Sequence, residues 1–271
     1  RPRRHAPVRR AGRSRQLVTG GNGVLLRGGQ THGGFRPQSR RGKVHLFATS
    51  ATRDAANNAD FAALLKAETG LTLEICSGDE EAALSFFGAT DGGDSGVIDI
   101  GGGSTEIIIG QGMNIRCSFS CQMGAVRLFQ RIPIRDHGDL DAVEQIAADI
   151  LTDKLLDYPV LSMPGSWRGT GGTFTTLAAM VKGIYWTDRT YMHGTVLTEA
   201  DVARFERQLA DMTLEQRKQL PGLQPNRADI VVHGICILRA IMRRMHIGQI
   251  TVSEYGNLDG YFKREYLMKK K

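Results

Sequence analysis

An acidic residue stands on each side of a run of three glycines, and this arrangement could hold a metal-bound phosphate. Asp99 precedes glycines 101–103, and Ser104 and Glu106 follow them, with β-branched residues on both flanks. The pattern predicts a β-hairpin whose turn is Gly102-Gly103. That register pairs Asp99 with Glu106, and directly opposed side chains lie on one face of a hairpin, about 5 Å apart.

Two carboxylates held face to face repel each other unless a cation lies between them. Mg²⁺ favours a few carboxylates together with water and phosphate oxygens, so it would suit the pair Asp99 and Glu106. The bare amides of the glycine turn can form an anion-binding nest beside it. Carboxylates, metal and phosphate cradle in one hairpin are a phosphoryl-transfer arrangement. The alternative is an ordinary hairpin with a solvated acid at each end.

The elements around the hairpin add a third acid and a second glycine loop. Ser77 and Glu80 form a capping box that opens a helix, and Glu81 lies in its first turn. Taken alone, Glu81 is better explained as a solvated acid favoured by the helix dipole. Residues 167–173 are a second glycine loop that leads directly into a helix over residues 174–180. This is either an anion site at a helix N-terminus or a simple helix-start turn.

The positive charge of the chain is confined to its first residues. Residues 1–43 hold eleven arginines and one lysine without any Asp or Glu, giving +12, whereas the other residues hold 23 basic and 28 acidic groups, giving −5. The folded body is therefore not predicted to bind nucleic acid. Its apolar runs are too short for a membrane span. The four cysteines lack a C-x-x-C spacing, which argues against structural zinc or a disulfide framework and favours a reducing, cytoplasmic setting.

Residues 1–42 have few apolar side chains, many Gly and Arg, and no helical or strand period, which predicts a largely disordered segment. It could be a basic arm for polyanions. We favour the interpretation that it is non-native, because the chain does not begin with Met and the composition resembles out-of-frame translation of GC-rich sequence. Further along, the polar stretch 91–95 predicts a linker and a domain boundary. His233, on an apolar helix, is predicted to be a packed histidine rather than a ligand.

Eight stretches in order between Lys43 and Phe262 resemble the exopolyphosphatase / guanosine pentaphosphate phosphatase (Ppx/GppA) family. They are residues 48–53, 77–82, 99–106, 123–128, 169–177, 193–198, 220–223 with 227–229, and 250–253. The resemblance implies an α/β fold with an actin/hexokinase/Hsp70-like (ribonuclease H-like) two-lobed architecture. Residues 43–92 would be a remnant of the first lobe and residues 93–271 the second lobe. Nothing in residues 1–42 matches the family's first phosphate loop, Asp-x-Gly-Ser-Asn-Ser, so the first lobe is expected to be incomplete.

The resemblance also implies roles for individual residues. Glu81 matches the family's catalytic glutamate, which is held near the water that attacks the terminal phosphorus. Asp99 and Glu106 match the acids that hold Mg²⁺. The residues that would bind phosphate are Gly101, Gly102, Gly103 and Ser104 in the first loop, Gly171, Gly172 and Thr173 in the second, and Arg53.

The expected function is that of a Mg²⁺-dependent phosphohydrolase acting on inorganic polyphosphate or on the 5′ γ-phosphate of guanosine pentaphosphate. The missing first loop motivates an alternative, a catalytically impaired protein that binds polyphosphate or guanosine penta- or tetraphosphate. A sugar or acetate kinase of the same superfamily is a third interpretation, against which the motif at residues 77–82 argues. Neither a nucleic-acid nor a membrane partner is expected, and the sequence leaves homodimer formation open.

Overall fold

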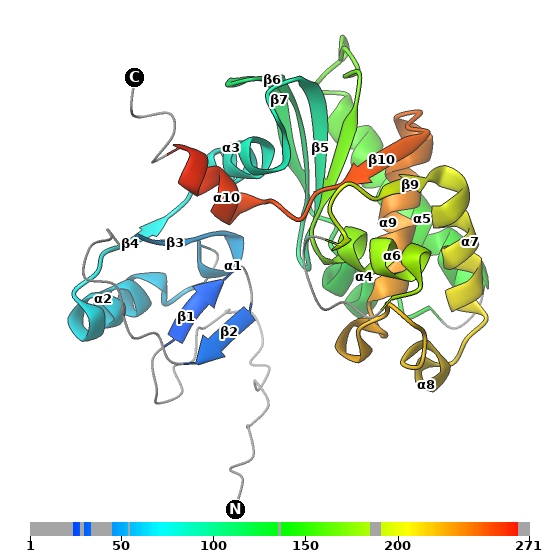
Figure 1. Cartoon of the computed structure of the whole chain (residues 1–271), viewed down its shortest axis with the longest axis horizontal. Coiled ribbons are helices and arrows are strands. Elements are labelled where there is room, and N and C mark those ends of the chain that lie inside the picture. Colours follow the sequence, from blue (N-terminus) through cyan, green and yellow to red (C-terminus); the bar gives the residue numbers. More distant parts are fainter. Residues whose placement is uncertain are drawn as a thin grey trace, which may run out of the picture. The chain divides into compact units, whose positions relative to one another are not determined.

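The computed structural model describes residues 24–27, 30–33, 45–53, 55–134, 137–184 and 191–264. They form two compact units, Arg1–Glu81 and Ala82–Lys271, which divide within one helix (Figure 1). The strands are β1 (Val24–Arg27), β2 (Gln30–Gly33), β3 (Leu46–Ala48), β4 (Leu73–Ile75), β5 (Asp94–Ile100), β6 (Thr105–Gln111), β7 (Asn114–Cys121), β8 (Trp167–Thr170), β9 (Val196–Thr198) and β10 (Gln249–Val252). The helices are α1 (Ser50–Arg53), α2 (Asn58–Thr69), α3 (Gly78–Ala89), α4 (Ala125–Arg131), α5 (His137–Leu155), α6 (Gly172–Lys182), α7 (Glu199–Ala210), α8 (Leu214–Arg217), α9 (Val231–Arg244), α10 (Asn257–Phe262) and the 3₁₀ turn η2 (Pro225–Arg227).

The first unit contains a small parallel βαβ arrangement. β3 and β4 pair in parallel, and α1 and α2 lie between them in the sequence. β1 and β2 form an antiparallel pair inside the segment predicted to be largely disordered. The remainder of that prediction, for the other residues of 1–42, lies outside the described residues.

Helix α3 begins where the sequence predicts. The N–H of Ser77 donates to Glu80 Oε2 at 2.8 Å, and the N–H of Glu80 donates to Ser77 Oγ at 3.2 Å, so the capping box is confirmed. Helix α3 runs through Gly88 to Ala89. This glycine serves a tertiary contact instead of ending the helix.

The second unit is built on a six-stranded mixed sheet in the order β7-β6-β5-β8-β10-β9. β5, β6 and β7 form an antiparallel meander, β8 is parallel to both β5 and β10, and β9 pairs antiparallel with β10. The stretch 91–95, predicted as a linker, runs into this sheet, since β5 begins at Asp94. The α/β fold class is as expected from the sequence.

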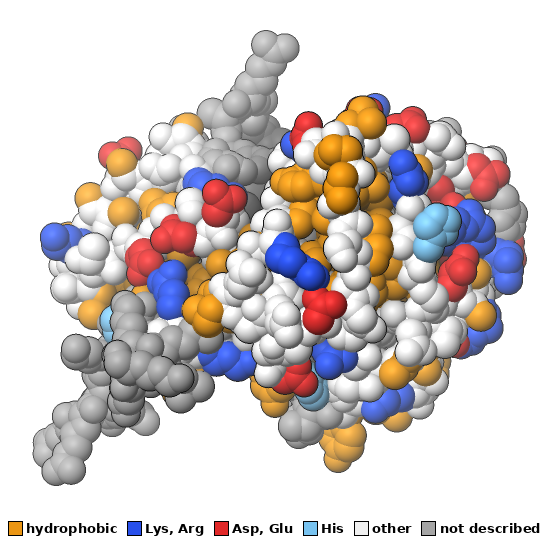
Figure 2. Space-filling view, turned by 90° about the horizontal axis from the view of Figure 1, so that it is seen from above, with side chains coloured by type: hydrophobic (Ala, Val, Ile, Leu, Met, Phe, Trp, Pro, Cys, Tyr) orange, Lys and Arg blue, Asp and Glu red, His pale blue; other side chains and the backbone are white. Residues whose placement is uncertain are grey.

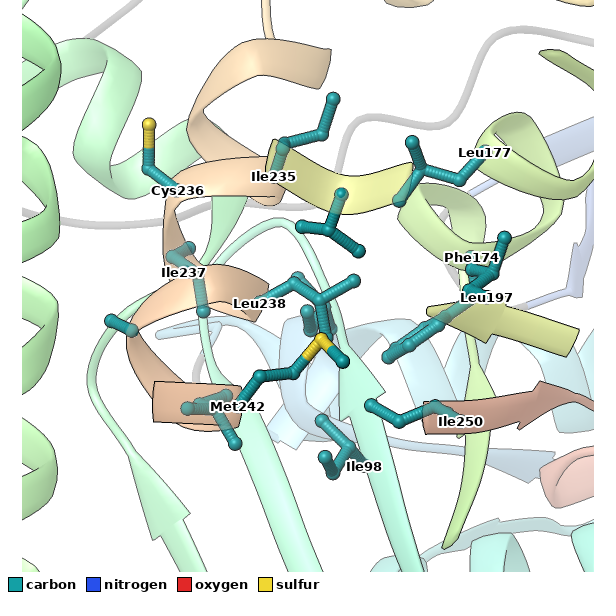
Figure 3. Packing of buried hydrophobic residues seen from close by; sticks show 14 of the residues in the cluster. Ile98, Phe174, Leu177, Leu197, Ile235, Cys236, Ile237, Leu238, Met242 and Ile250 are labelled. Atoms are coloured by element: carbon teal, nitrogen blue, oxygen red, sulfur yellow. The ribbon is translucent and has the colours of Figure 1, made fainter. Parts of the chain in front are cut away.

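Successive residues of β5 and β6 point to opposite faces of the sheet and pack against different helices, so the second unit has three layers. Ile98 and Ile107 belong to the large core shared with α5, α6 and α9, while Val97 and Ile108 pack with α3. Figure 3 shows the large core, with Ile98 and Ile250 from the sheet facing Leu238 and Met242 of α9. The strands are therefore buried on both faces along their central residues.

None of the described helices has the length and apolar content needed to cross a membrane. Figure 2 shows Lys and Arg side chains interspersed with Asp and Glu over the described surface on the face viewed. The concentration of basic residues noted in the sequence is thus a property of residues 1–43 and not of this face.

Glycines allow α10 to cross α3 at backbone contact. A Cβ added at Gly260 would lie 1.9 Å from the carbonyl oxygen of Leu84, and one at Gly88 would lie 2.1 Å from the carbonyl oxygen of Gly256. The Lys263 side chain adds hydrogen bonds to the carbonyls of Phe87, Gly88 and Thr90, at 2.7, 3.2 and 3.0 Å. Because the last carbonyls of α3 lack partners within the helix, this ammonium group caps it.

The substitution Gly260→Ala is expected to destabilise the protein by roughly 1–3 kcal/mol, because the added methyl group must push backbone apart. Urea unfolding at 25 °C measures the change. Gly165→Ala is the matched control, since nothing lies within 4 Å of its Cβ position. Equal midpoints for the two variants would contradict the close crossing.

Candidate active site

The glycine hairpin has the predicted register. Asp99 is directly opposite Glu106 and Ile100 is opposite Thr105, and the N–H of Gly101 donates to the carbonyl of Ser104 at 3.0 Å. Both acids belong to the face of the sheet that packs against α3, because they alternate in phase with Val97 and Ile108 of the same strands. Two carboxylates therefore lie side by side on one face, at the end of the strands where the glycine turn begins.

Asp99 is enclosed by hydroxyl groups. Its Oδ2 accepts a hydrogen bond of 3.0 Å from Ser85 Oγ of α3, and Thr170 of β8 is its neighbour across the sheet. Burial raises the pKa of Asp99, while the hydroxyls of Ser85 and Thr170 lower it. A carboxylate whose charge is disfavoured by burial gains most from a bound cation.

Glu106 is the second oxygen donor. Its Oε1 accepts a hydrogen bond of 2.9 Å from Ser120 Oγ, on the neighbouring strand β7. Within the described residues no group of three or more His, Cys, Asp or Glu side chains could hold a metal ion. The pair of carboxylates fits Mg²⁺, which keeps several waters and takes its remaining ligands from phosphate oxygens.

The glycine turn directs its amides to one side. The carbonyls of Gly101 and Gly102 accept hydrogen bonds from the N–H groups of Ala125 and Arg127, at 3.0 and 2.9 Å, and the carbonyl of Gly103 accepts one of 2.5 Å from Arg127 Nε. In a trans peptide the N–H points opposite to the carbonyl of the same unit. The N–H groups of residues 102, 103 and 104 therefore point away from α4, as the predicted anion-binding nest requires.

The second glycine loop packs against the end of β5. Gly171 has φ of 93°, in the left-handed region, and caps α6. A Cβ there would lie 2.8 Å from the carbonyl oxygen of Ile100 and 2.9 Å from Asp99 Oδ1. Only glycine satisfies both the backbone angle and the close approach. The two loops predicted separately from the sequence thus meet at Asp99, with the N-terminus of α6 beside them.

Two of the predicted phosphate-binding residues differ in what they can offer. Thr173 is buried, and its hydroxyl lies against Gly234 of α9, where a Cβ would be 2.3 Å from Thr173 Oγ1. Its side chain thus belongs to helix packing, and its backbone N–H remains as the group for a ligand. Gly172 lies under the guanidinium of Arg227, since a Cβ at Gly172 would collide with Nη1.

Each glycine loop has an arginine to which the sequence interpretation assigned no role. Arg127 binds the first loop through Gly103, and Arg227 covers the second loop at Gly172. Burial lowers the pKa of Arg227, and the carboxylate of Glu254 raises it. In the sequence, these two arginines stand out only because they lie in two of the stretches that resemble the family, residues 123–128 and 227–229. These cations suit a polyanionic ligand.

In the first unit, the structure brings together Arg53 and Glu81. Arg53 Nη1 lies 3.1 Å from Glu81 Oε2 and donates a hydrogen bond of 2.9 Å to the carbonyl of Cys76. The Glu81 side chain is 13% exposed and that of Arg53 32%. The sequence predicted a role for each residue but not their ion pair.

Two predictions of ordinary structural roles can also be compared with the structure. His233 is buried, one ring nitrogen bonds the carbonyl of Ile132 at 2.8 Å, and its ring packs edge-on against Phe129. It is a packed histidine, as predicted. The four cysteines are buried and none of them forms a disulfide, and burial raises the pKa of the Cys121 thiol to about 12.

The chain is similar to proteins of one phosphatase family. Residues 38–268 match the Ppx/GppA phosphatase family. Exopolyphosphatase 2 of Mycobacterium tuberculosis is 34% identical over 235 residues, covering 80% of this chain and 73% of that protein. The crystal structure of the Aquifex aeolicus Ppx/GppA family member superposes with a TM-score of 0.75 at 26% identity, covering 84% of this chain and 75% of that one. An exopolyphosphatase from Cytophaga hutchinsonii gives 0.68 at 27% identity, over 81% and 74% of the two chains. The chain belongs to the Ppx/GppA phosphatase family.

Proposed function

We propose that the protein is a Mg²⁺-dependent exopolyphosphatase that hydrolyses the terminal phosphoanhydride bond of inorganic polyphosphate. One observation carries the proposal: Asp99 and Glu106 face each other beside two glycine loops that meet at Asp99. Family membership and the identity to an exopolyphosphatase support the reaction class. A polyphosphate chain presents anionic oxygens on every phosphate, which the amides and arginines would bind directly and the carboxylates through a bound cation.

Different groups of the site would bind the phosphate and the metal ion. The N–H groups of residues 102–104 and the N-terminus of α6 would bind phosphate oxygens, with Arg127 and Arg227 adding positive charge. Asp99 and Glu106 would hold Mg²⁺, which when bound neutralises the charge on the phosphate oxygens. Phosphoryl transfer depends mainly on such positioning and charge neutralisation, since its transition state is loose.

Glu81 would orient the attacking water and accept its proton. The water oxygen forms a bond to the terminal phosphorus, the bridging P–O bond breaks, and the electron pair leaves with the shortened chain as a phosphate oxygen. An ion-paired carboxylate is a modest base, and a loose transition state requires proton transfer only late. Arg53, which is ion-paired with Glu81, would hold that carboxylate in place.

Guanosine pentaphosphate offers the same chemistry at its 5′ end, where a terminal phosphoanhydride is hydrolysed. We include it as a second substrate in the proposal, because the binding groups described above contact phosphate and not a base. We also place the protein in the cytoplasm, a proposal supported by four buried cysteines that form no disulfide.

Phosphate release from long-chain polyphosphate tests the function. We expect Mg²⁺-dependent release of single phosphates, abolished by EDTA and restored by excess Mg²⁺, while chains shorten from the end in gel analysis. Guanosine pentaphosphate is assayed in parallel for conversion to the tetraphosphate. Tight binding of polyphosphate without turnover of either substrate would contradict the proposal and favour a binding protein.

A further inference from the structure

The carboxylate of Asp99 is held on two sides by groups from different elements. Ser85 Oγ, on the buried side of α3, lies 3.0 Å from Oδ2, and Ser85 is 1% exposed. Gly171 closes the other side, because even a Cβ there would come within 2.9 Å of Oδ1. The direction of this carboxylate is therefore fixed by helix α3 and by the second glycine loop.

The Ser85 hydroxyl is itself held by Asn257, the first residue of α10. Ser85 Oγ is in hydrogen-bond contact with both Asp99 and the side-chain amide of Asn257. A hydroxyl has one hydrogen and cannot donate to two acceptors. In the structure Asn257 Oδ1 faces Ser85 Oγ, and the arrangement is satisfied when this amide is turned so that its NH₂ donates to Ser85 Oγ while the hydroxyl donates to Asp99 Oδ2. The orientation of an amide is assigned from such networks.

Asn257 occupies a fixed position because α10 crosses α3 at backbone contact. Gly260 lies one turn after Asn257, against the carbonyl of Leu84, and Gly256 lies against Gly88. Lys263 fastens the far end of α10 to the last carbonyls of α3. The crossing places the amide of Asn257 next to Ser85, although 172 residues separate them in the sequence.

We propose that Ser85 and Asn257 are positioning residues that orient Asp99 toward the cation, acting through the chain Asn257–Ser85–Asp99. The inference rests on the proposed function, in which Asp99 holds Mg²⁺. Groups that orient a metal ligand typically change metal affinity or activity by about 10–100-fold when they are removed. Loss of the Ser85 hydroxyl leaves Thr170 as the remaining hydroxyl on Asp99, and loss of the Asn257 amide leaves the Ser85 hydroxyl free to rotate, so in either case the cation must order the carboxylate further on binding.

Mn²⁺ binding, followed by electron paramagnetic resonance on the full chain, tests the proposal without relying on turnover. We expect Ser85→Ala and Asn257→Ala to weaken Mn²⁺ binding by about 10–100-fold. The Mg²⁺ concentration for half-maximal phosphate release should rise in parallel, and KM for polyphosphate at saturating Mg²⁺ should change little. Ser85→Thr, which keeps the hydroxyl, should restore binding. Ser95→Ala is the matched control, since it removes another buried hydroxyl from strand β5 that bonds Ser166 and not Asp99.

Asp99→Asn, measured in parallel, separates the claim that Ser85 and Asn257 position Asp99 from the claim that Asp99 binds the metal ion. If Asp99→Asn weakens Mn²⁺ binding while folded Ser85→Ala and Asn257→Ala bind as the unchanged chain does, the positioning role is wrong and the metal site stands. If Asp99→Asn binds Mn²⁺ as the unchanged chain does, the metal site itself is wrong. Asn257 is only partly buried, so its variant keeps the test decisive even where a Ser85 substitution perturbs folding.

Discussion

Replacing Glu81 by Gln lowers the turnover of polyphosphate by about 10²–10⁴-fold, the usual contribution of a general base. The amide keeps the size of the side chain and can still accept a hydrogen bond from Arg53, which lies 3.1 Å from Glu81 Oε2. It cannot accept a proton from water. The loss should therefore appear in kcat and leave KM for polyphosphate within a few-fold of the unchanged chain.

Glu80→Gln is the control for this substitution. Glu80 is the preceding acid of the same helix, and its carboxylate serves the capping box by accepting from Ser77. A glutamine there still accepts that hydrogen bond, so activity should be retained. Equal rates for Glu81→Gln and Glu80→Gln would remove Glu81 from the chemistry.

Replacing Arg239 by Met is expected to cost about 1–3 kcal/mol of stability, because it leaves the buried carboxyl group of Glu206 without its donor and removes a cation beside Glu144. Arg239 of α9 donates through Nη1 to Glu206 of α7, and its Nε lies 3.3 Å from Glu144 Oε1 of α5. The three side chains are between 4% and 14% exposed. Urea unfolding at pH 7 measures the loss.

Arg243→Met is the matched control on the same helix. Arg243 Nη1 lies 2.8 Å from Glu144 Oε2, but its side chain is 50% exposed, so its loss should cost at most about 1 kcal/mol. Losses of equal size in the two variants would contradict a buried cluster centred on Arg239.

The same cluster makes stability depend on pH in a defined direction. Burial and the neighbouring Glu144 raise the pKa of Glu206 to about 8. The folded state therefore binds a proton that the unfolded chain releases near its ordinary pKa of about 4.3. The stabilisation of the folded state by this group is fully present below about pH 4.3, and it is lost as the pH rises from there through about 8. Glu206→Gln, which stays neutral, should flatten the decline between about pH 4 and pH 8.

Local patterns were sufficient to predict the parts of the site that lie within one element or one turn. The register of Asp99 opposite Glu106 follows from β-branched flanks around glycines, which leave one way to close the hairpin. The capping box at Ser77 and the glycine start of α6 are likewise set by neighbours in the sequence. Such features depend on short-range sterics and hydrogen bonds, which a single sequence displays.

Contacts between distant segments were not predictable in the same way. A glycine such as Gly88 is typical of a helix end, but it is needed here because the backbone of Gly256 lies against it. No residue near Gly88 in the sequence indicates that contact. Arg227 reaches the second glycine loop only once η2 and α6 are packed in the fold. The cluster around Arg239 joins three helices whose amphipathic patterns show polar positions but not which acids meet which arginine.

The most direct test of the central claim is the Mg²⁺ dependence of phosphate release from polyphosphate in Asp99→Asn and Glu106→Gln. Each substitution removes one of the paired carboxylates and keeps its shape, and Asp94→Asn, on the same strand but paired with Arg116, is the control. We predict that both site variants lose at least about 10²-fold in activity and require more Mg²⁺, as expected when charge stabilisation of the transition state is removed, while Asp94→Asn stays within about threefold. Full activity at unchanged Mg²⁺ in both site variants would contradict the account.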